Sequence, residues 1–195
     1  MEKIDARGQA CPLPVVRAKK ALAQMSEGAL EVLVDNRTAV HNLEALARTL
    51  KLEAAADERG EAEFAVTFVK GAPAGNAPAP AAAAGGIVAV IPSEFMGSGD
   101  DELGAVLMKG FVFALAQLDE LPRTVLLYNG GVKLACEGSS SLDDLRALAE
   151  AGVEVMSCGT CLNHYGLAER LAVGEATNMY AIVEKQAGAS GIVRP

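Results

Sequence analysis

The sequence predicts an α/β protein made of two domains, and three observations lead to this prediction. Residues 71–86 read GAPAGNAPAPAAAAGG, which has no charged or large apolar side chain and is therefore typical of a linker. Residues 1–70 show strand and helix patterns in the order βαβαββ, which predicts a two-layer α/β sandwich. Residues 87–195 alternate apolar runs with helical patterns, which predicts an open, mostly parallel, flavodoxin-like α/β/α layer domain.

Hydrophobic periodicity predicts each element of residues 1–70. A short strand is expected near Lys3–Ala6, and a helix is expected from Pro12 to Met25. Alternation predicts a strand over Leu30–Asp35, and a second helix begins near Thr38. Two strands joined by a turn at Glu58–Gly60 close the domain. The side chains expected to be buried are Val15, Ala18, Leu22 and Met25 in the first helix, Val40, Leu43, Ala47 and Leu50 in the second, and Phe64, Val66 and Phe68 in the last strand.

Continuous apolar runs predict the strands of residues 87–195, because strands of a parallel sheet are covered on both faces. These runs are Ile87–Ile91, Thr124–Tyr128, Val153–Met156 and Met179–Val183. Helical patterns lie at 100–118, 142–151 and 162–173. Ligands of such folds bind beyond the carboxyl ends of the strands, which here carry Ser93, Asn129–Gly131 and Cys158.

Composition excludes several classes of function. A formal net charge of -8 argues against direct binding to nucleic acid, because the phosphate backbone would be repelled. The start of the chain has no apolar signal segment, and no apolar run is long enough to span a bilayer. We therefore expect a cytoplasmic protein without membrane contact, whose four cysteines stay reduced.

The first chemical signal is the segment Arg7-Gly8-Gln9-Ala10-Cys11-Pro12-Leu13-Pro14. Proline suits the first position of a helix and disfavours helical backbone in the residue before it, so Cys11 is expected at the N-cap of the first helix. There the free N–H groups and the helix dipole would favour the thiolate by about 0.3–1 kcal/mol. The alternative is a small residue at a strand–helix turn, since free cysteines are usually buried and inert.

This segment resembles the TusA/SirA-like sulfur-carrier family, whose mark is a short strand, Arg-Gly, and Cys-Pro-x-Pro opening a helix. Arg7, Gly8, Cys11, Pro12 and Pro14 match that pattern, and the resemblance extends over about residues 3–70. The resemblance implies that Cys11 carries a persulfide, receives it from a donor such as a cysteine desulfurase, and passes it to a downstream relay protein. No organic cofactor is then required.

The second chemical signal is Cys158-Gly159-Thr160-Cys161, which follows a predicted strand and opens a predicted helix. Three interpretations stay open: a redox or sulfur-relay pair, half of a metal site, or two packing residues. A zinc site needs four ligands, and Cys136 and His164 would have to complete it, so we predict no metal. His164 would lie one helical turn from Cys161 and could act as its base, or simply lie on the helix surface.

Residues 87–195 resemble the DsrE/DsrF-like family of small α/β sulfur-transfer proteins. The resemblance is carried by Cys158 at a strand end, Gly166 eight residues later, and the turn Asn129-Gly130-Gly131-Val132-Lys133. The whole arrangement is similar to YedF-type proteins of selenium metabolism. It implies Cys158 as the reactive cysteine, Cys161 as a resolving thiol, and homo-oligomers formed through this domain.

The sequence therefore predicts a sulfur or selenium carrier in which Cys11 hands a persulfide to a partner or to Cys158. Two other functions compete with it. One is a binding or oligomerisation module in which only Cys11 reacts. The other is a dithiol oxidoreductase that works through Cys158 and Cys161 alone.

Overall fold

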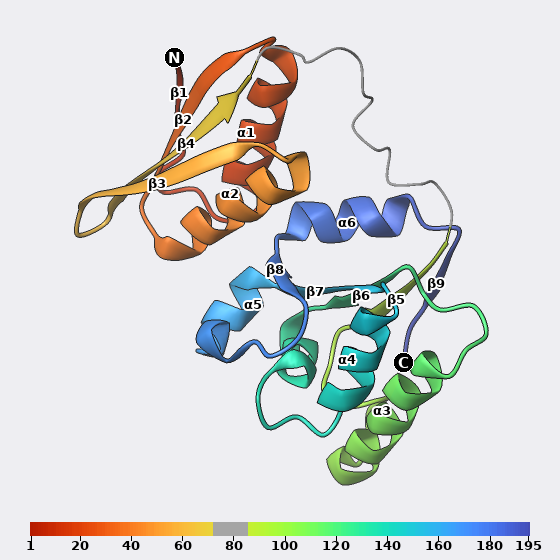
Figure 1. The fold of residues 1–195 in the computed structure, drawn as a ribbon. Coiled ribbons are helices and arrows are strands. Elements are labelled where there is room, and N and C mark those ends of the chain that lie inside the picture. The colour runs from red at the N-terminus through yellow and green to blue at the C-terminus, as the bar shows by residue number, and fades with distance from the viewer. Residues whose placement is uncertain (72–85) are drawn as a thin grey trace. The chain divides into compact units, whose positions relative to one another are not determined.

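The computed structural model describes residues 1–71 and 86–195, so most of the predicted linker lies outside the described residues. The chain divides into two compact units, and each contains its own sheet. The N-terminal unit has a mixed four-stranded sheet, and the C-terminal unit has a parallel five-stranded sheet (Figure 1). The predicted α/β fold class is confirmed.

Four strands and two helices make up the N-terminal unit: β1 (Glu2–Asp5), α1 (Leu13–Gln24), β2 (Gly28–Val34), α2 (Arg37–Leu50), β3 (Glu53–Gly60) and β4 (Glu63–Lys70). This is the predicted βαβαββ order. The sheet order is β1-β2-β4-β3; β1 runs parallel to β2, and the other neighbours are antiparallel. Both helices lie against one face of this sheet (Figure 1).

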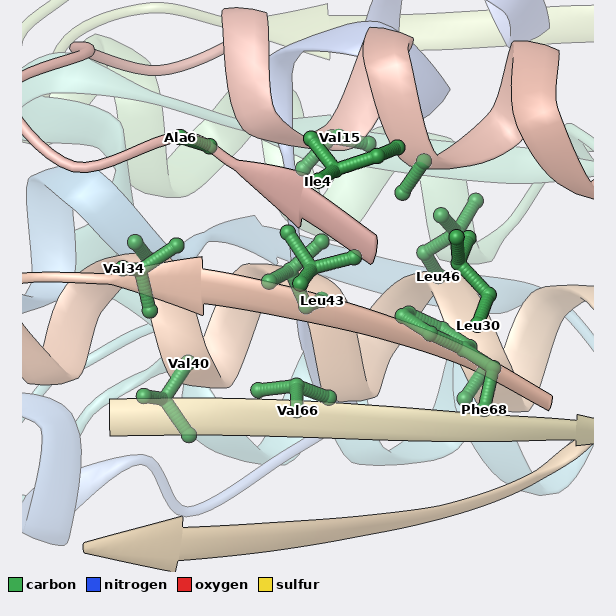
Figure 2. Packing of buried hydrophobic residues seen from close by; sticks show 14 of the residues in the cluster. Ile4, Ala6, Val15, Leu30, Val34, Val40, Leu43, Leu46, Val66 and Phe68 are labelled. Carbon is green, nitrogen blue, oxygen red and sulfur yellow. The ribbon is translucent and has the colours of Figure 1, made fainter. Parts of the chain in front are cut away.

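Apolar side chains between the helices and the sheet form the core of this unit. Figure 2 shows Leu30 and Val34 of β2 and Val66 and Phe68 of β4 gathered with Leu43 of α2. Leu30, Leu43, Val66 and Phe68 are fully buried. Burying a side chain of this size stabilises the fold by about 1.5–3 kcal/mol. The predicted helix stripes are confirmed, except that Met25 and Leu50 are only partly buried at the core's margin.

The turn between β3 and β4 is displaced from its predicted position. The prediction placed it at Glu58–Gly60, but these residues still belong to β3, and the chain reverses at residues 61–62. A bulge between Glu58 and Gly60 lets the strand continue, and Gly60 then pairs with Glu63. A bulge adds one unpaired residue to a strand, which the alternation of side chains does not reveal.

The C-terminal unit contains β5 (Ile87–Ile91), α3 (Asp101–Ala116), β6 (Thr124–Leu127), the short 3-10 helix η1 (Asn129–Ala135), α4 (Leu142–Glu150), β7 (Glu154–Cys158), α5 (Gly159–His164), the 3-10 helix η2 (Ala168–Arg170), β8 (Glu175–Thr177), α6 (Met179–Ala187) and β9 (Gly191–Val193). All neighbouring strands are parallel, in the order β8-β7-β6-β5-β9. This order differs from the flavodoxin order 2-1-3-4-5. Helices α3 and α4 cover one face of the sheet, and α6 lies on the other (Figure 1).

The predicted strand Met179–Val183 is wrong, because this segment is the start of α6. An apolar run of this length does not distinguish a strand from a buried helix segment. The helix continues through the polar helix formers of 184–187 and buries only Ala181 and Ile182, while Val183 is 56% exposed. The strand at the sheet edge is instead Glu175–Thr177, which pairs with β7.

The predicted helix over 162–173 is also wrong, because α5 ends at His164. Gly166 follows with a left-handed φ of 65°, a backbone conformation that only glycine adopts easily. The amide of Leu167 donates to the carbonyl of Leu162 at 2.8 Å, and that of Gly166 donates to Asn163 at 3.1 Å. These two bonds are the Schellman arrangement that ends a helix.

Parallel strands bring their carboxyl ends to the same edge of the C-terminal sheet. Ile91 ends β5, Leu127 ends β6 and Cys158 ends β7, so the segments after them are neighbours. Gly131 shows how closely these segments pack: a Cβ there would lie 2.1 Å from the carbonyl oxygen of Ile91. None of the helices in residues 1–71 and 86–195 is both long and apolar enough to cross a membrane.

Candidate functional sites: two cysteine sites at strand ends

Cys11 lies in a surface turn between β1 and α1, and its side chain is half-buried. The Cys11–Pro12 peptide bond is cis, and the amide of Leu13 donates to the carbonyl of Ala10 at 3.0 Å, which closes the turn. The first hydrogen bond of the helix runs from the Val16 amide to the carbonyl of Pro12 at 3.0 Å. Cys11 is therefore reachable from solvent and lies immediately before the helix.

This geometry corrects the predicted start of the helix. Pro12 was expected at the first helical position with Cys11 at the N-cap, but Pro12 itself is the N-cap and α1 begins at Leu13. The reason is the turn over residues 10–13, which uses the Leu13 amide and delays the helix by one residue. Cys11 thus stands one residue outside the N-cap.

Ion pairs and hydrogen bonds hold the loop that carries Cys11. Arg7 binds the Asp5 carboxylate at 2.6 Å, and Arg17 of α1 donates to the Asp5 carbonyl at 2.7 Å. The hydrogen bonds from Arg7 lower the pKa of Asp5 to about 2. Asp35, after β2, accepts the amide of Gly8 at 2.5 Å, and this bond lowers the pKa of Asp35. Gly8 has a φ of 73°, which explains the glycine in the motif.

Cys158 and Cys161 lie together at the carboxyl end of β7. Cys158 is the last residue of the strand and is 1% exposed, whereas Cys161 lies in α5 and is half-buried. Burial raises the pKa of Cys158 to about 12, while backbone hydrogen bonds from Cys161 and Thr160 act in the opposite direction and a side-chain hydrogen bond with Cys161 raises the pKa further. The backbone amide of Asn129, the residue that opens η1, donates to the Cys161 sulfur at 3.1 Å.

Side chains that follow β5, β6 and α5 extend this second site. The Tyr165 hydroxyl donates to the Asn129 side-chain oxygen at 3.0 Å. The Lys133 ammonium lies 4.9 Å from the centre of the Tyr165 ring and forms an ion pair with Glu94. The Glu94 carboxylate raises the pKa of Lys133. Glu94, Lys133 and Tyr165 line a pocket of about 420 Å³.

Sequence reasoning noted the segment 129–133 but did not assign functional roles to Glu94 or Tyr165. Glu94 and Lys133 have ordinary surface residue types, and their pairing depends on the neighbouring ends of two strands. The useful signal was the rule that ligand sites lie beyond the carboxyl ends of parallel strands.

Cys136 and His164, whose participation the sequence left open, have different surroundings. Cys136 lines the pocket but is buried, and its thiol donates to the carbonyl of Val132 at 3.2 Å. Burial raises its pKa. His164 is exposed at the end of α5, and its ring packs edge-on against Tyr165 with 5.0 Å between centroids. Within residues 1–71 and 86–195, no three His, Cys, Asp or Glu side chains are grouped to hold a metal ion.

A family model described as sulfurtransferase TusA matches residues 2–70, which include the Cys11 loop. A protein of Methanocaldococcus jannaschii, named as a candidate sulfur carrier, is 35% identical over 71 residues, which are 36% of this chain and 95% of that protein. The chain belongs to the TusA family. The similarity that shows this membership covers the N-terminal unit.

Other relatives of this TusA-family chain are similar over parts of different length. A candidate sulfur carrier of Neisseria meningitidis serogroup A is 50% identical over 48 residues, which are 24% of this chain and 65% of that protein. The crystal structure of a SirA-like protein from Desulfitobacterium hafniense has 42% identity, covers 36% of this chain and 99% of its own, and gives a TM-score of 0.35. A structure of a protein of unknown function from Methanobacterium thermoautotrophicum has 26% identity, covers 56% of this chain and 97% of its own, and gives a TM-score of 0.43.

Proposed function

We propose that this protein is a sulfur carrier that holds a persulfide on Cys11 and passes the outer sulfur to a thiol. The observation that carries the proposal is the half-exposed position of Cys11, in a turn directly before α1 and within the TusA-family region. A carrier atom must be reached by both a donor and an acceptor, which a surface turn permits. The relatives named as sulfur carriers support the same function.

The transfer step is an exchange between thiols. The Cys11 thiolate attacks the outer sulfur of a persulfide on a donor, such as a cysteine desulfurase. The S–S bond of the donor breaks, the donor leaves as a thiolate, and Cys11 becomes the persulfide. A second exchange gives the sulfur to a downstream relay protein or to the Cys158–Cys161 pair. Because both steps need reduced thiols, the proposal places the protein in the cytoplasm.

For the C-terminal unit we propose a DsrE/DsrF-like role as acceptor, in an arrangement of the YedF type. The two cysteines at the carboxyl end of an inner parallel strand support this role. Selenium can replace sulfur in the same exchange, because a perselenide is attacked by a thiolate in the same way. The hydrogen-bonded pair also supports the second candidate function, a dithiol oxidoreductase using Cys158 and Cys161.

We further propose that the C-terminal unit associates with a second copy of itself through α3. Leu103, Val106, Leu107 and Phe113 of this helix are 45–65% exposed, while Met108 and Val112 on its other side are buried. Exposed apolar side chains gathered on one helix mark a surface that a partner usually covers. Sedimentation velocity should show an oligomer that Phe113→Asp weakens and the exposed polar control Lys109→Gln does not. A monomeric parent protein would refute this part of the proposal.

Intact-mass analysis after incubation with a cysteine desulfurase and cysteine tests the carrier function. We expect an adduct of one sulfur atom that is lost in Cys11→Ser and retained in the matched control Cys136→Ser. Labelling that survives in Cys11→Ser and disappears in Cys158→Ser or Cys161→Ser would move the primary chemistry to the second unit. No sulfur on any cysteine, together with a reversible Cys158–Cys161 disulfide, would favour the oxidoreductase.

A further inference from the structure

The two thiols of the Cys158–Cys161 pair are not equivalent. Cys158 is 1% exposed and ends a strand that has a neighbour on each side, β6 and β8. Cys161 is partly exposed, and its sulfur accepts the main-chain amide of Asn129 at 3.1 Å. From this geometry we infer that Cys161 is the thiol that accepts sulfur in the C-terminal unit, with Asn129 N–H as its stabilising donor and Cys158 as the resolving thiol. The assignment rests on the proposed sulfur transfer and reverses the roles expected from the motif.

The attacking group in a thiol exchange is the thiolate, and it must reach the sulfur that it attacks. Towards an external donor Cys158 meets neither condition, because it is enclosed and its burial raises its pKa to about 12. Its thiol therefore stays protonated near neutral pH. The sulfur that Cys158 can reach is that of Cys161, to which its thiol is hydrogen-bonded. Cys161 is partly exposed, so an external persulfide can reach its sulfur, and the Asn129 amide holds that sulfur in place.

The backbone at Asn129 places this donor. Asn129 follows β6 directly and has a left-handed φ of 48°. Asparagine adopts this conformation more readily than most residues, because its short polar side chain bonds locally. Here the side-chain oxygen accepts the Tyr165 hydroxyl, while the amide faces Cys161. The amide is thus held by the end of the strand rather than by a movable side chain.

The proposed reaction has two balanced steps. The Cys161 thiolate attacks the outer sulfur of a persulfide R–S–SH; R leaves as a thiolate, and Cys161 becomes a persulfide that keeps the proton on the transferred sulfur. Cys158 then attacks the Cys161 sulfur, its thiol proton passes to the leaving hydrosulfide, and hydrogen sulfide departs. The transferred sulfur is reduced, and the two cysteines are oxidised to a disulfide. An external dithiol must reduce that disulfide before the next cycle.

Glutathione persulfide is a suitable small donor for testing this assignment on the full chain. The parent protein for the test carries Cys11→Ser, so that only the C-terminal unit can react. We expect this parent to form the Cys158–Cys161 disulfide and to release sulfide. Adding Cys158→Ser should trap one sulfur atom on Cys161, and adding Cys161→Ser should lower the rate of labelling by at least about 100-fold. Cys158→Ala serves as a second trap variant, and circular dichroism checks that each variant is folded.

Trapping on Cys158 in the Cys161→Ser variant, with no adduct in the Cys158→Ser variant, would reverse the assignment and overturn the inference. Absence of any adduct or disulfide in all folded variants would also overturn it. The carrier function of Cys11 is judged separately, from desulfurase labelling that the unmutated chain shows and the Cys11→Ser variant lacks. Loss of that labelling would remove the proposed function. If the labelling persists but the Cys158→Ser variant traps no sulfur on Cys161, only the role given to Cys161 is removed.

Discussion

Cys11 and the Cys158–Cys161 pair both follow a strand and precede or enter a helix, but different parts of the structure hold them. The Cys11 loop lies on the surface and is fixed by exposed ion pairs, such as Arg7 with Asp5. The Cys158–Cys161 pair lies where three parallel strands end together, and the thiol of Cys158 is enclosed. The exposed loop is accessible to a large partner, whereas the enclosed thiol is not.

The largest expected effect is a loss of stability of the folded protein at alkaline pH, caused by ionisation of the Cys158 thiol. Burial raises the pKa of this thiol from 9.0 to about 12. Because the folded pKa is the higher one, the stabilisation is complete below the unfolded pKa and is lost as the pH rises through the folded pKa. One pKa unit corresponds to about 1.4 kcal/mol, so the free energy of unfolding should fall by about 3 kcal/mol at about pH 11 and by up to about 4 kcal/mol at higher pH.

Denaturant unfolding at about pH 7 and about pH 11 measures this loss in the wild type and in Cys158→Ala. We expect the variant to lose much less stability between the two pH values than the wild type does. Equal alkaline losses in the wild type and Cys158→Ala would show that the enclosed thiol does not distinguish the two sites.

A pair of glycine substitutions gives the next largest effect. A Cβ at Gly131 would lie 2.1 Å from the Ile91 carbonyl oxygen, so the backbone must move to make room for it. We therefore expect Gly131→Ala to lower the free energy of unfolding by about 3 kcal/mol. A Cβ at Gly8 meets nothing within 4 Å, but its φ is 73°, so Gly8→Ala should lower it by only about 1 kcal/mol. Calorimetry of both variants measures the difference, and similar losses would contradict it.

How much of the fold the sequence revealed depended on how local the signal was. Helical spacing correctly indicated the buried faces of α1 and α2, and a continuous apolar run gave β5 with its bounds. The apolar run over 179–183 led to a wrong prediction of a strand, because the segment is a helix. Over five residues, a strand buried on both faces and a helix segment give the same apolar pattern. The bulge before Gly60 and the helix stop at Gly166 depend on backbone conformation, for which glycine is only an indirect sign.

The two cysteine sites also differed in how much of their surroundings local sequence could predict. The placement of Cys11 just before a helix could be predicted, because its motif joins a cysteine, a proline and a nearby helix start within a few residues. The environment of Cys161 could not, because its donor is a main-chain amide from a segment 32 residues away in sequence. Any residue but proline supplies that amide, so no residue type marks it. Burial of Cys158, which separates the two thiols of one motif, is likewise a property of the folded sheet edge.

The smallest expected effect distinguishes the Asn129 backbone from its side chain. Asn129→Gly keeps the amide and suits the φ of 48°, but it removes the bond to Tyr165. We therefore expect the rate of Cys161 alkylation by iodoacetamide to change by less than about twofold and the stability by about 0.5 kcal/mol at most. Tyr165→Phe, the matched control, removes the same bond from its other end and should behave alike. A tenfold slower reaction in both variants would instead show that the side-chain network, rather than the main-chain amide, governs the reactivity of Cys161.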